Sequence, residues 1–130
     1  MENVKETYEA LLSLAKRWGV YVTVRPMPGP LQGKIWGIYA HKDSDEALPP
    51  ELEHLAWLEH WIWLEEDLPL ERQVYVLAHE LGHYLYQLEH GDLPKYYWAY
   101  DKELHAKVET EVNDYAKRLL SYVGVEEVLI

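Results

Sequence analysis

The stretch that decides this fold is Val74–Leu88, VYVLAHELGHYLYQL, which carries the pattern H-E-x-x-H at His79, Glu80 and His83. On a helix, residues four positions apart lie one above the other, so His79 and His83 can offer their rings to a single metal ion. Glu80 lies beside them, with a carboxylate that can act on whatever the ion binds. Two imidazoles and an acid at this spacing are typical of a zinc-dependent hydrolase, with Glu80 as the general base.

The same stretch has the apolar periodicity of a helix that faces a core. Apolar residues recur at steps of three and four, at Val74, Leu77, Leu81, Leu85 and Leu88. Upstream, the segment Asp67–Glu71 is typical of a helix start, with a capping aspartate and a proline in the first turn. Gly91–Pro94 breaks the pattern, so the sequence predicts a helix over about 69–89. Gly82 costs this helix about 1 kcal/mol relative to alanine, which suggests that another element approaches closely there.

The composition of the chain favours one compact domain, and we expect residues 1–130 to form it. No apolar run reaches the roughly 18 residues needed to cross a bilayer. The N-terminus lacks the pattern of a secretion signal, so we expect a cytoplasmic protein. Cysteine is absent, so any metal site must use histidines and carboxylates. The formal net charge of −11 disfavours direct binding to nucleic acid or to an anionic membrane. Nothing in the sequence indicates an oligomeric state.

The remaining periodicities predict an α+β fold. Helical spacing covers residues 2–18 and 102–123, and residues 51–58 read as a short helix. Strand-like alternation covers residues 20–25, 34–40 and 60–64, with the second strand antiparallel to the first. The aromatic stretch at 95–100, KYYWAY, has no clear period.

A catalytic zinc normally takes three protein ligands, so the helix at 102–123 must supply the third. Its candidates are Glu103, His105, Glu109 and Glu111. At 100° per residue, Glu109 lies beside the apolar stripe of that helix, where burial of a carboxylate requires a positive partner such as a metal. Glu111 lies at the other edge, where it can pair with a cation in solvent. We therefore predict Glu109 as the third ligand, with His105 or Glu111 as alternatives. A surface ion pair is the other interpretation of Glu109.

Two segments resemble the ImmA/IrrE metallopeptidases: Asp67–Leu85, DLPLERQVYVLAHELGHYL, and Glu109–Leu120, ETEVNDYAKRLL. The family pattern is a proline-led helix ending in H-E-x-G-H, followed about 25 residues later by E-x-E-A-N-x-F-A-x-x-L-L. The first motif is matched by His79, Glu80 and His83. The second is matched by Glu109, Glu111, Asn113, Tyr115, Ala116, Leu119 and Leu120, with valine at 112 for the usual alanine and tyrosine at 115 for the usual phenylalanine.

The resemblance implies a zincin-like fold with an N-terminal helix, a small three-stranded antiparallel sheet, an active-site helix and a C-terminal helix. It implies one Zn²⁺ ion on His79, His83 and Glu109, and hydrolysis of a peptide bond in a protein target. It also points to a helix-turn-helix transcriptional repressor as that target.

The candidates for contact with the oxyanion or substrate are Tyr84, His90, Tyr96, Tyr97, Tyr100 and His105. Two other classes of function compete with a peptidase. One is a zincin-like protein that cleaves nothing and binds a basic partner. The other is an acidic inhibitor or nucleic-acid mimic in which the histidines merely pack.

Overall fold

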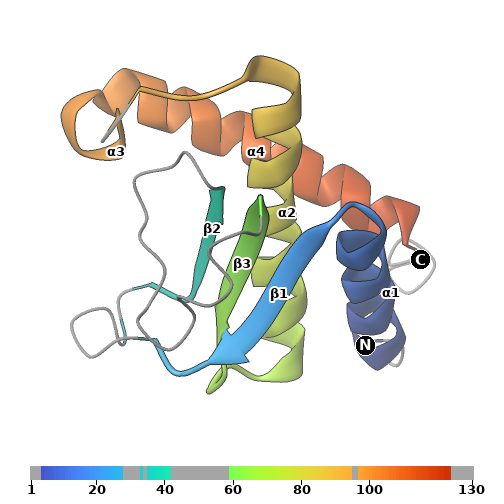
Figure 1. The fold of residues 1–130 in the computed structure, drawn as a ribbon. Coiled ribbons are helices and arrows are strands. Elements are labelled where there is room, and N and C mark those ends of the chain that lie inside the picture. The colour runs from blue at the N-terminus through green and yellow to red at the C-terminus, as the bar shows by residue number, and fades with distance from the viewer. Residues whose placement is uncertain (1–3, 28–32, 34, 42–58, 95–96, 124–130) are drawn as a thin grey trace.

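The computed structural model describes residues 4–27, 33, 35–41, 59–94 and 97–123. The elements follow in the order α1 (Val4–Arg17), β1 (Val20–Arg25), β2 (Gly37–His41), β3 (His60–Glu65), α2 (Leu70–His90), α3 (Tyr97–Tyr100) and α4 (Lys102–Tyr122) (Figure 1). The predicted α+β class and its three strands are confirmed. The short helix expected at 51–58 lies outside the described residues. Within the described part of the chain, no helix has the length and apolar character needed to cross a membrane.

The sheet is mixed, which corrects the expectation of an antiparallel sheet. Its strand order is β1-β3-β2, so the first two strands are not neighbours. β1 runs parallel to β3, with Val20 opposite His60, whereas β2 runs antiparallel to it, with Gly37 opposite Leu64. β3 is buried from its second residue to its last. A strand with no polar face is best accommodated between two neighbours, which places β3 at the centre.

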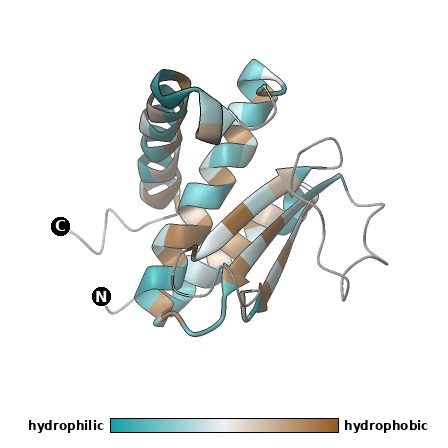
Figure 2. Cartoon of the chain, turned by 90° about the vertical axis from the view of Figure 1, so that its left-hand side faces the viewer, coloured by the Kyte–Doolittle hydropathy of each residue, from teal (hydrophilic) through white to brown (hydrophobic). Residues whose placement is uncertain are grey.

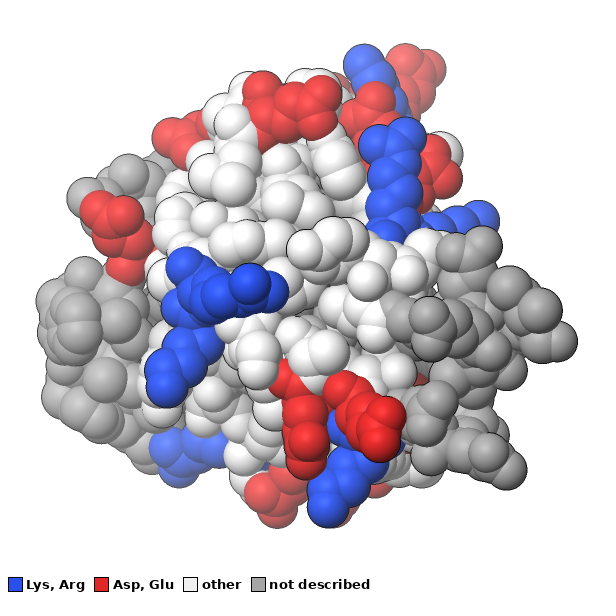
Figure 3. Space-filling model, turned by 90° about the vertical axis from the view of Figure 1, so that its right-hand side faces the viewer, with Lys and Arg blue, Asp and Glu red and all other residues white. Residues whose placement is uncertain are grey.

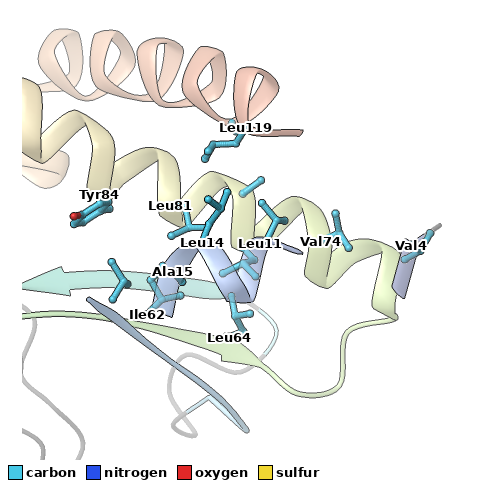
Figure 4. Close-up of a cluster of buried hydrophobic side chains, with 14 residues drawn as sticks. Val4, Leu11, Leu14, Ala15, Ile62, Leu64, Val74, Leu81, Tyr84 and Leu119 are labelled. Atoms are coloured by element: carbon cyan, nitrogen blue, oxygen red, sulfur yellow. The ribbon is translucent and has the colours of Figure 1, made fainter. Parts of the chain in front are cut away.

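Each face of the sheet carries its own hydrophobic cluster. On one face, Ile62 and Leu64 pack against α1 and α2 in the main core, which Leu119 of α4 also joins (Figure 4). On the other face, Trp61 and Trp63 pack with Met27 and Ala40. Figure 2 shows hydrophobic residues along the strands and hydrophilic ones interspersed on the helices. The strand-like alternation predicted at residues 60–64 is confirmed, since the two tryptophans and Ile62 belong to different clusters.

α2 is the central helix, and it lies behind the sheet in Figure 1. Its buried side includes Val74, Leu77 and Leu81, as predicted, but Leu88 is 60% exposed, so the apolar stripe ends before that residue. Pro69 rather than Asp67 occupies the N-cap position, and no side chain caps this end. The helix ends at Gly91, which has φ 79° and whose N–H donates to the carbonyl of Gln87.

α4 crosses α2 at Gly82. A Cβ atom on this glycine would lie 2.7 Å from the carbonyl oxygen of Val112 and 3.1 Å from its Cγ1 atom. Any larger residue would therefore push the two helices apart. The close approach predicted at Gly82 is confirmed, and the approaching element is the helix that carries Glu109.

Candidate metal centre

α2 and α4 bring His79, His83 and Glu109 to one point. The Nε2 atom of His79 lies 3.1 Å from Oε2 of Glu109, and that of His83 lies 3.5 Å from Oε1. The possible ligand atoms of the three residues all lie within 4.8 Å of one another. The two histidines face the same way because they are one helical turn apart, with ring centroids separated by 5.0 Å.

This geometry fits a small divalent cation. Zinc bonds to nitrogen and oxygen are about 2.0–2.2 Å long, so ligand atoms around a tetrahedral ion lie roughly 3.3–3.6 Å apart. The separations of 3.1 and 3.5 Å between imidazole nitrogen and carboxylate oxygen are close to that spacing. The His79 and Glu109 side chains are 29% and 33% exposed. These residues are therefore not packed away in the core, and both an ion and a substrate can reach them.

The imidazole and carboxylate groups at this point shift each other's pKa values. Hydrogen bonds from His79 and His83 hold the pKa of Glu109 well below its ordinary value. The hydrogen bond with Glu109 raises the pKa of His79, outweighing the opposite effect of burial. Imidazole and carboxylate thus share a proton at the place where a cation would bind, and binding a metal there would release that proton.

Asn113 orients the first histidine. Its Oδ1 atom lies 3.0 Å from Nδ1 of His79. With the amide oxygen as acceptor, Nδ1 carries a proton, so loss of the proton that Nε2 shares with Glu109 would leave on Nε2 the lone pair that a metal requires. Asn113 lies one turn beyond Glu109 on the same side of α4, so one helix supplies both a possible ligand and the group that aligns another.

Glu80 lies beneath the edge of the sheet and is 7% exposed. A Cβ atom on Gly37 would lie 2.5 Å from Cγ1 of Val76 and 3.0 Å from Oε2 of Glu80. Glycine at position 37 therefore lets β2 close over α2 and leaves room for the carboxylate. The position of Glu80 next to His79 suits a base that acts on a group bound at the centre.

Two clefts meet at the centre. The Tyr39 cleft encloses about 510 Å³, and its lining includes Tyr39, His83, Asp92, Tyr97 and His105. The Trp36 cleft encloses about 770 Å³, and its lining includes Trp36, Arg72, Tyr75, Val76, Ala116 and Lys117. Both clefts are bordered by Gly37, His79 and Glu80, so together they run past the three converging side chains.

Two of the six candidate oxyanion contacts face this centre. Both Tyr97 and His105 line the Tyr39 cleft, and Nε2 of His105 lies 3.5 Å from Oε1 of Glu109. Tyr84 instead packs on the far side of α2. Its ring stacks on Trp18, and its hydroxyl donates to the Trp18 carbonyl at 3.3 Å. The hydroxyl of Tyr84 is therefore directed away from the candidate metal centre.

The other candidates are placed elsewhere. His90 stacks on Tyr86 and approaches Glu111 to 3.8 Å, so Glu111 lies beside His90 rather than beside His79 and His83. Tyr100 is 85% exposed and does not line either cleft. Tyr96 lies outside the described residues. Of the two alternative third ligands, only His105 is near the centre.

β2 contributes residues to which the sequence alone assigns no role. Tyr39 lines a cleft, and its hydroxyl lies 2.9 Å from Nδ1 of His60. Burial raises the pKa of the Tyr39 phenol, so its hydroxyl keeps its proton beside the His60 imidazole. A glycine inside a predicted strand, at Gly37, was the available signal, because such a glycine often marks a close backbone approach.

Comparison with known families adds independent information. The profile of the IrrE N-terminal-like domain, Peptidase_M78, matches residues 38–120, which is more than half of the chain. The matched range includes His79, Glu80, His83, Glu109 and Asn113. Searches of curated proteins and of solved structures found no significant match.

Proposed function

Since the chain belongs to the IrrE N-terminal-like domain family, a family of peptidases, we propose that it is a zinc-dependent endopeptidase acting on a protein target. The observation that carries the proposal is the convergence of His79, His83 and Glu109 beside the buried Glu80. The resemblance to the ImmA/IrrE metallopeptidases adds a helix-turn-helix repressor as the specific target to test.

In the proposed hydrolysis, the three candidate ligands and Glu80 have different roles. Zinc held by His79, His83 and Glu109 would supply a Lewis acid that polarises the scissile carbonyl and makes water a nucleophile near neutral pH. Glu80 accepts the proton of the attacking water and passes it to the departing amine. Burial under Gly37 keeps the Glu80 carboxylate in place for both transfers.

Charge that develops on the carbonyl oxygen needs a donor, and His105 and Tyr97 are the described candidates in the Tyr39 cleft. Loss of such a donor costs about 2.7–4 kcal/mol of transition-state stabilisation in other hydrolases.

The sheet offers a place for the substrate backbone. In the described sheet, β2 is an edge strand, and residues at both of its ends border the clefts. An extended peptide can pair with the free edge of such a strand. It would then pass over Glu80 and the three candidate ligands.

The metal site is tested by a matched pair of variants. Glu109→Gln and Glu111→Gln make the same chemical change on one helix, but only Glu109 lies between the two histidines. After equilibrium dialysis against zinc, we expect one ion per chain in the wild type and in Glu111→Gln, and loss of tight binding in Glu109→Gln. Zinc binding that survives in Glu109→Gln and fails in Glu111→Gln would contradict the proposed ligand set.

Catalysis is tested with the zinc-loaded chain and a peptide library made from a proteome digest, with cut sites read by mass spectrometry. Glu80→Gln should keep its zinc and cleave at least about 100-fold more slowly, as expected for loss of a general base. Glu89→Gln, an exposed change on the same helix, should cleave like the wild type. Undiminished cleavage by Glu80→Gln would refute the assignment of the base.

The other classes of function predict different results. Bound zinc without cleavage of any peptide, or of a captured partner, would favour a partner-binding protein. A nucleic-acid mimic requires a continuous acidic surface. On the face shown in Figure 3, acidic and basic side chains are scattered around a largely uncharged area, so this face does not provide one.

A further inference from the structure

We infer that the Trp36 cleft binds the substrate segment that follows the cleaved bond, and that it selects a large apolar side chain next to the bond and an acidic one two to four residues further on. The inference rests on the proposed peptidase function and names the class of substrate. It is carried by the direction of β2, the apolar floor of the cleft, and two cations at its outer end.

The direction of the substrate follows from β2. This strand runs from Gly37, which borders both clefts, to His41, which lines the Tyr39 cleft, and Trp36 lies just before it. Antiparallel pairing is the more stable arrangement per residue, and β2 already pairs in this way with β3. A peptide antiparallel to β2 enters through the Tyr39 cleft and leaves through the Trp36 cleft. The residues after the bond therefore lie in the Trp36 cleft.

The part of the Trp36 cleft near Glu80 is apolar. Val76 of α2 and Ala116 of α4 line it, and the Trp36 and Tyr75 side chains are each 46% exposed beside it. An apolar substrate side chain placed here would remove its own surface and that of both aromatic rings from water. At about 770 Å³ the cleft is larger than any one side chain, so it can accept several consecutive residues.

The outer end of the cleft is basic in a strongly acidic chain. Arg72 lies over the Trp36 ring at 5.7 Å, and Lys117 is exposed on α4. Together with Glu71, these side chains leave one net positive charge at that end. The Tyr39 cleft differs, because its described lining contains Asp92 but neither lysine nor arginine. The basic end of the Trp36 cleft thus has no counterpart among the described lining residues of the Tyr39 cleft.

Helix geometry sets the position of the acidic substrate residue. Arg72 precedes Glu80 by about two helical turns, or ~12 Å along the axis, and Lys117 follows Asn113 by one turn, or ~6 Å. An extended peptide advances about 3.3 Å per residue. Residues roughly two to four positions beyond the bond therefore come within reach of the two cations.

Binding is measured with zinc-loaded Glu80→Gln, so that cleavage does not interfere. The probes are fluorescein-labelled peptides of one parent sequence, with leucine or glycine at the first position and glutamate or lysine three residues later. By fluorescence anisotropy, we expect leucine to bind about tenfold more tightly than glycine. Glutamate should bind roughly three- to fivefold more tightly than lysine, as expected for exposed ion pairs.

A charge reversal shows whether the Trp36 cleft is responsible. In the double variant Glu80→Gln, Lys117→Glu, we expect the lysine probe to bind more tightly than the glutamate probe, which reverses the preference. Arg118→Glu changes the net charge equally at the adjacent position of α4, outside the cleft lining, and should leave the preference intact. Equal affinity for all probes, or the same loss of preference in both variants, would overturn the inference.

The cut sites of the wild type separate this inference from the proposed function. We expect leucine, phenylalanine, tyrosine or tryptophan to be enriched directly after the bond, and aspartate or glutamate two to four residues further on. Cleavage without this enrichment refutes the selectivity and leaves the peptidase standing. Absence of cleavage, with the probe preferences intact, refutes the peptidase and supports the Trp36 cleft as a peptide-binding site.

Discussion

Replacement of Gly82 by alanine tests whether the crossing of α2 and α4 builds the candidate metal centre. The added Cβ atom would lie 2.7 Å from the Val112 carbonyl oxygen and 3.5 Å from Cβ of Tyr115. A backbone atom cannot rotate away, so α4 must shift by several tenths of an ångström. Glu109 lies one turn before Val112 and moves with it, away from His79 and His83.

Two opposing effects determine the change in stability. Alanine is favoured over glycine within a helix by about 1 kcal/mol. Overpacking of a buried contact costs about 1–3 kcal/mol. The free energy of unfolding of Gly82→Ala should therefore fall by roughly 0–2 kcal/mol. Metal affinity should respond more strongly, because misplacing the groups around a metal typically weakens its binding 10- to 100-fold.

Urea unfolding of the metal-free chain and zinc titration against a competing chelator measure the two quantities. Gly19→Ala is the control, because Gly19 has φ 77° and no atom within 4 Å of an added Cβ. Its left-handed conformation should cost alanine about 1–2 kcal/mol without changing zinc affinity. The reasoning is refuted if Gly82→Ala gains about 1 kcal/mol and binds zinc like the wild type.

Three further changes follow from the structure. Asn113→Ala removes the acceptor of the His79 ring and should weaken zinc binding about 10- to 100-fold at little cost in stability, by the same titration. Leu77→Ala empties a fully buried position and should lower the free energy of unfolding by about 2–5 kcal/mol in urea. The pH profile of the metal-free chain is the third. The lowered pKa of Glu109 adds stability above its ordinary pKa of 4.5, and the raised pKa of His79 adds stability that is complete below its ordinary 6.5. When unfolding is measured across pH in the presence of a chelator, the contribution of the His79–Glu109 interaction to the free energy of unfolding should be largest between pH 4.5 and 6.5. Glu109→Gln should flatten that dependence of the free energy on pH.

Much of the candidate centre could be predicted because it is encoded by position along single helices. The spacing of His79 and His83 places both rings on one side of α2, whatever surrounds that helix. The apolar stripe of α4 likewise places Glu109 at the edge of a buried face. The structure brings these three side chains within reach of one ion, as the periodicity implied.

Predictions that needed the relation between elements were less successful. The alternation of the first two strands is compatible with direct pairing, and only the burial of β3 on both faces places it between them. Tyr84 follows His83 directly in sequence, yet the 100° rotation between neighbouring helix positions turns it toward Trp18 and the core. Proximity in sequence was therefore a poor guide to which tyrosine faces the centre.

Two glycines explain why the centre depends on three elements at once. Gly82 admits α4 from one side of α2, so that Glu109 reaches the two imidazoles. Gly37 lets β2 pack closely over α2 from the other side, at Val76 and Glu80. In each case the reason for glycine lies in an element distant in sequence. The pattern of a single helix or strand can therefore show that a glycine is unusual at its position. Only the packed fold shows which neighbouring backbone the glycine allows to approach.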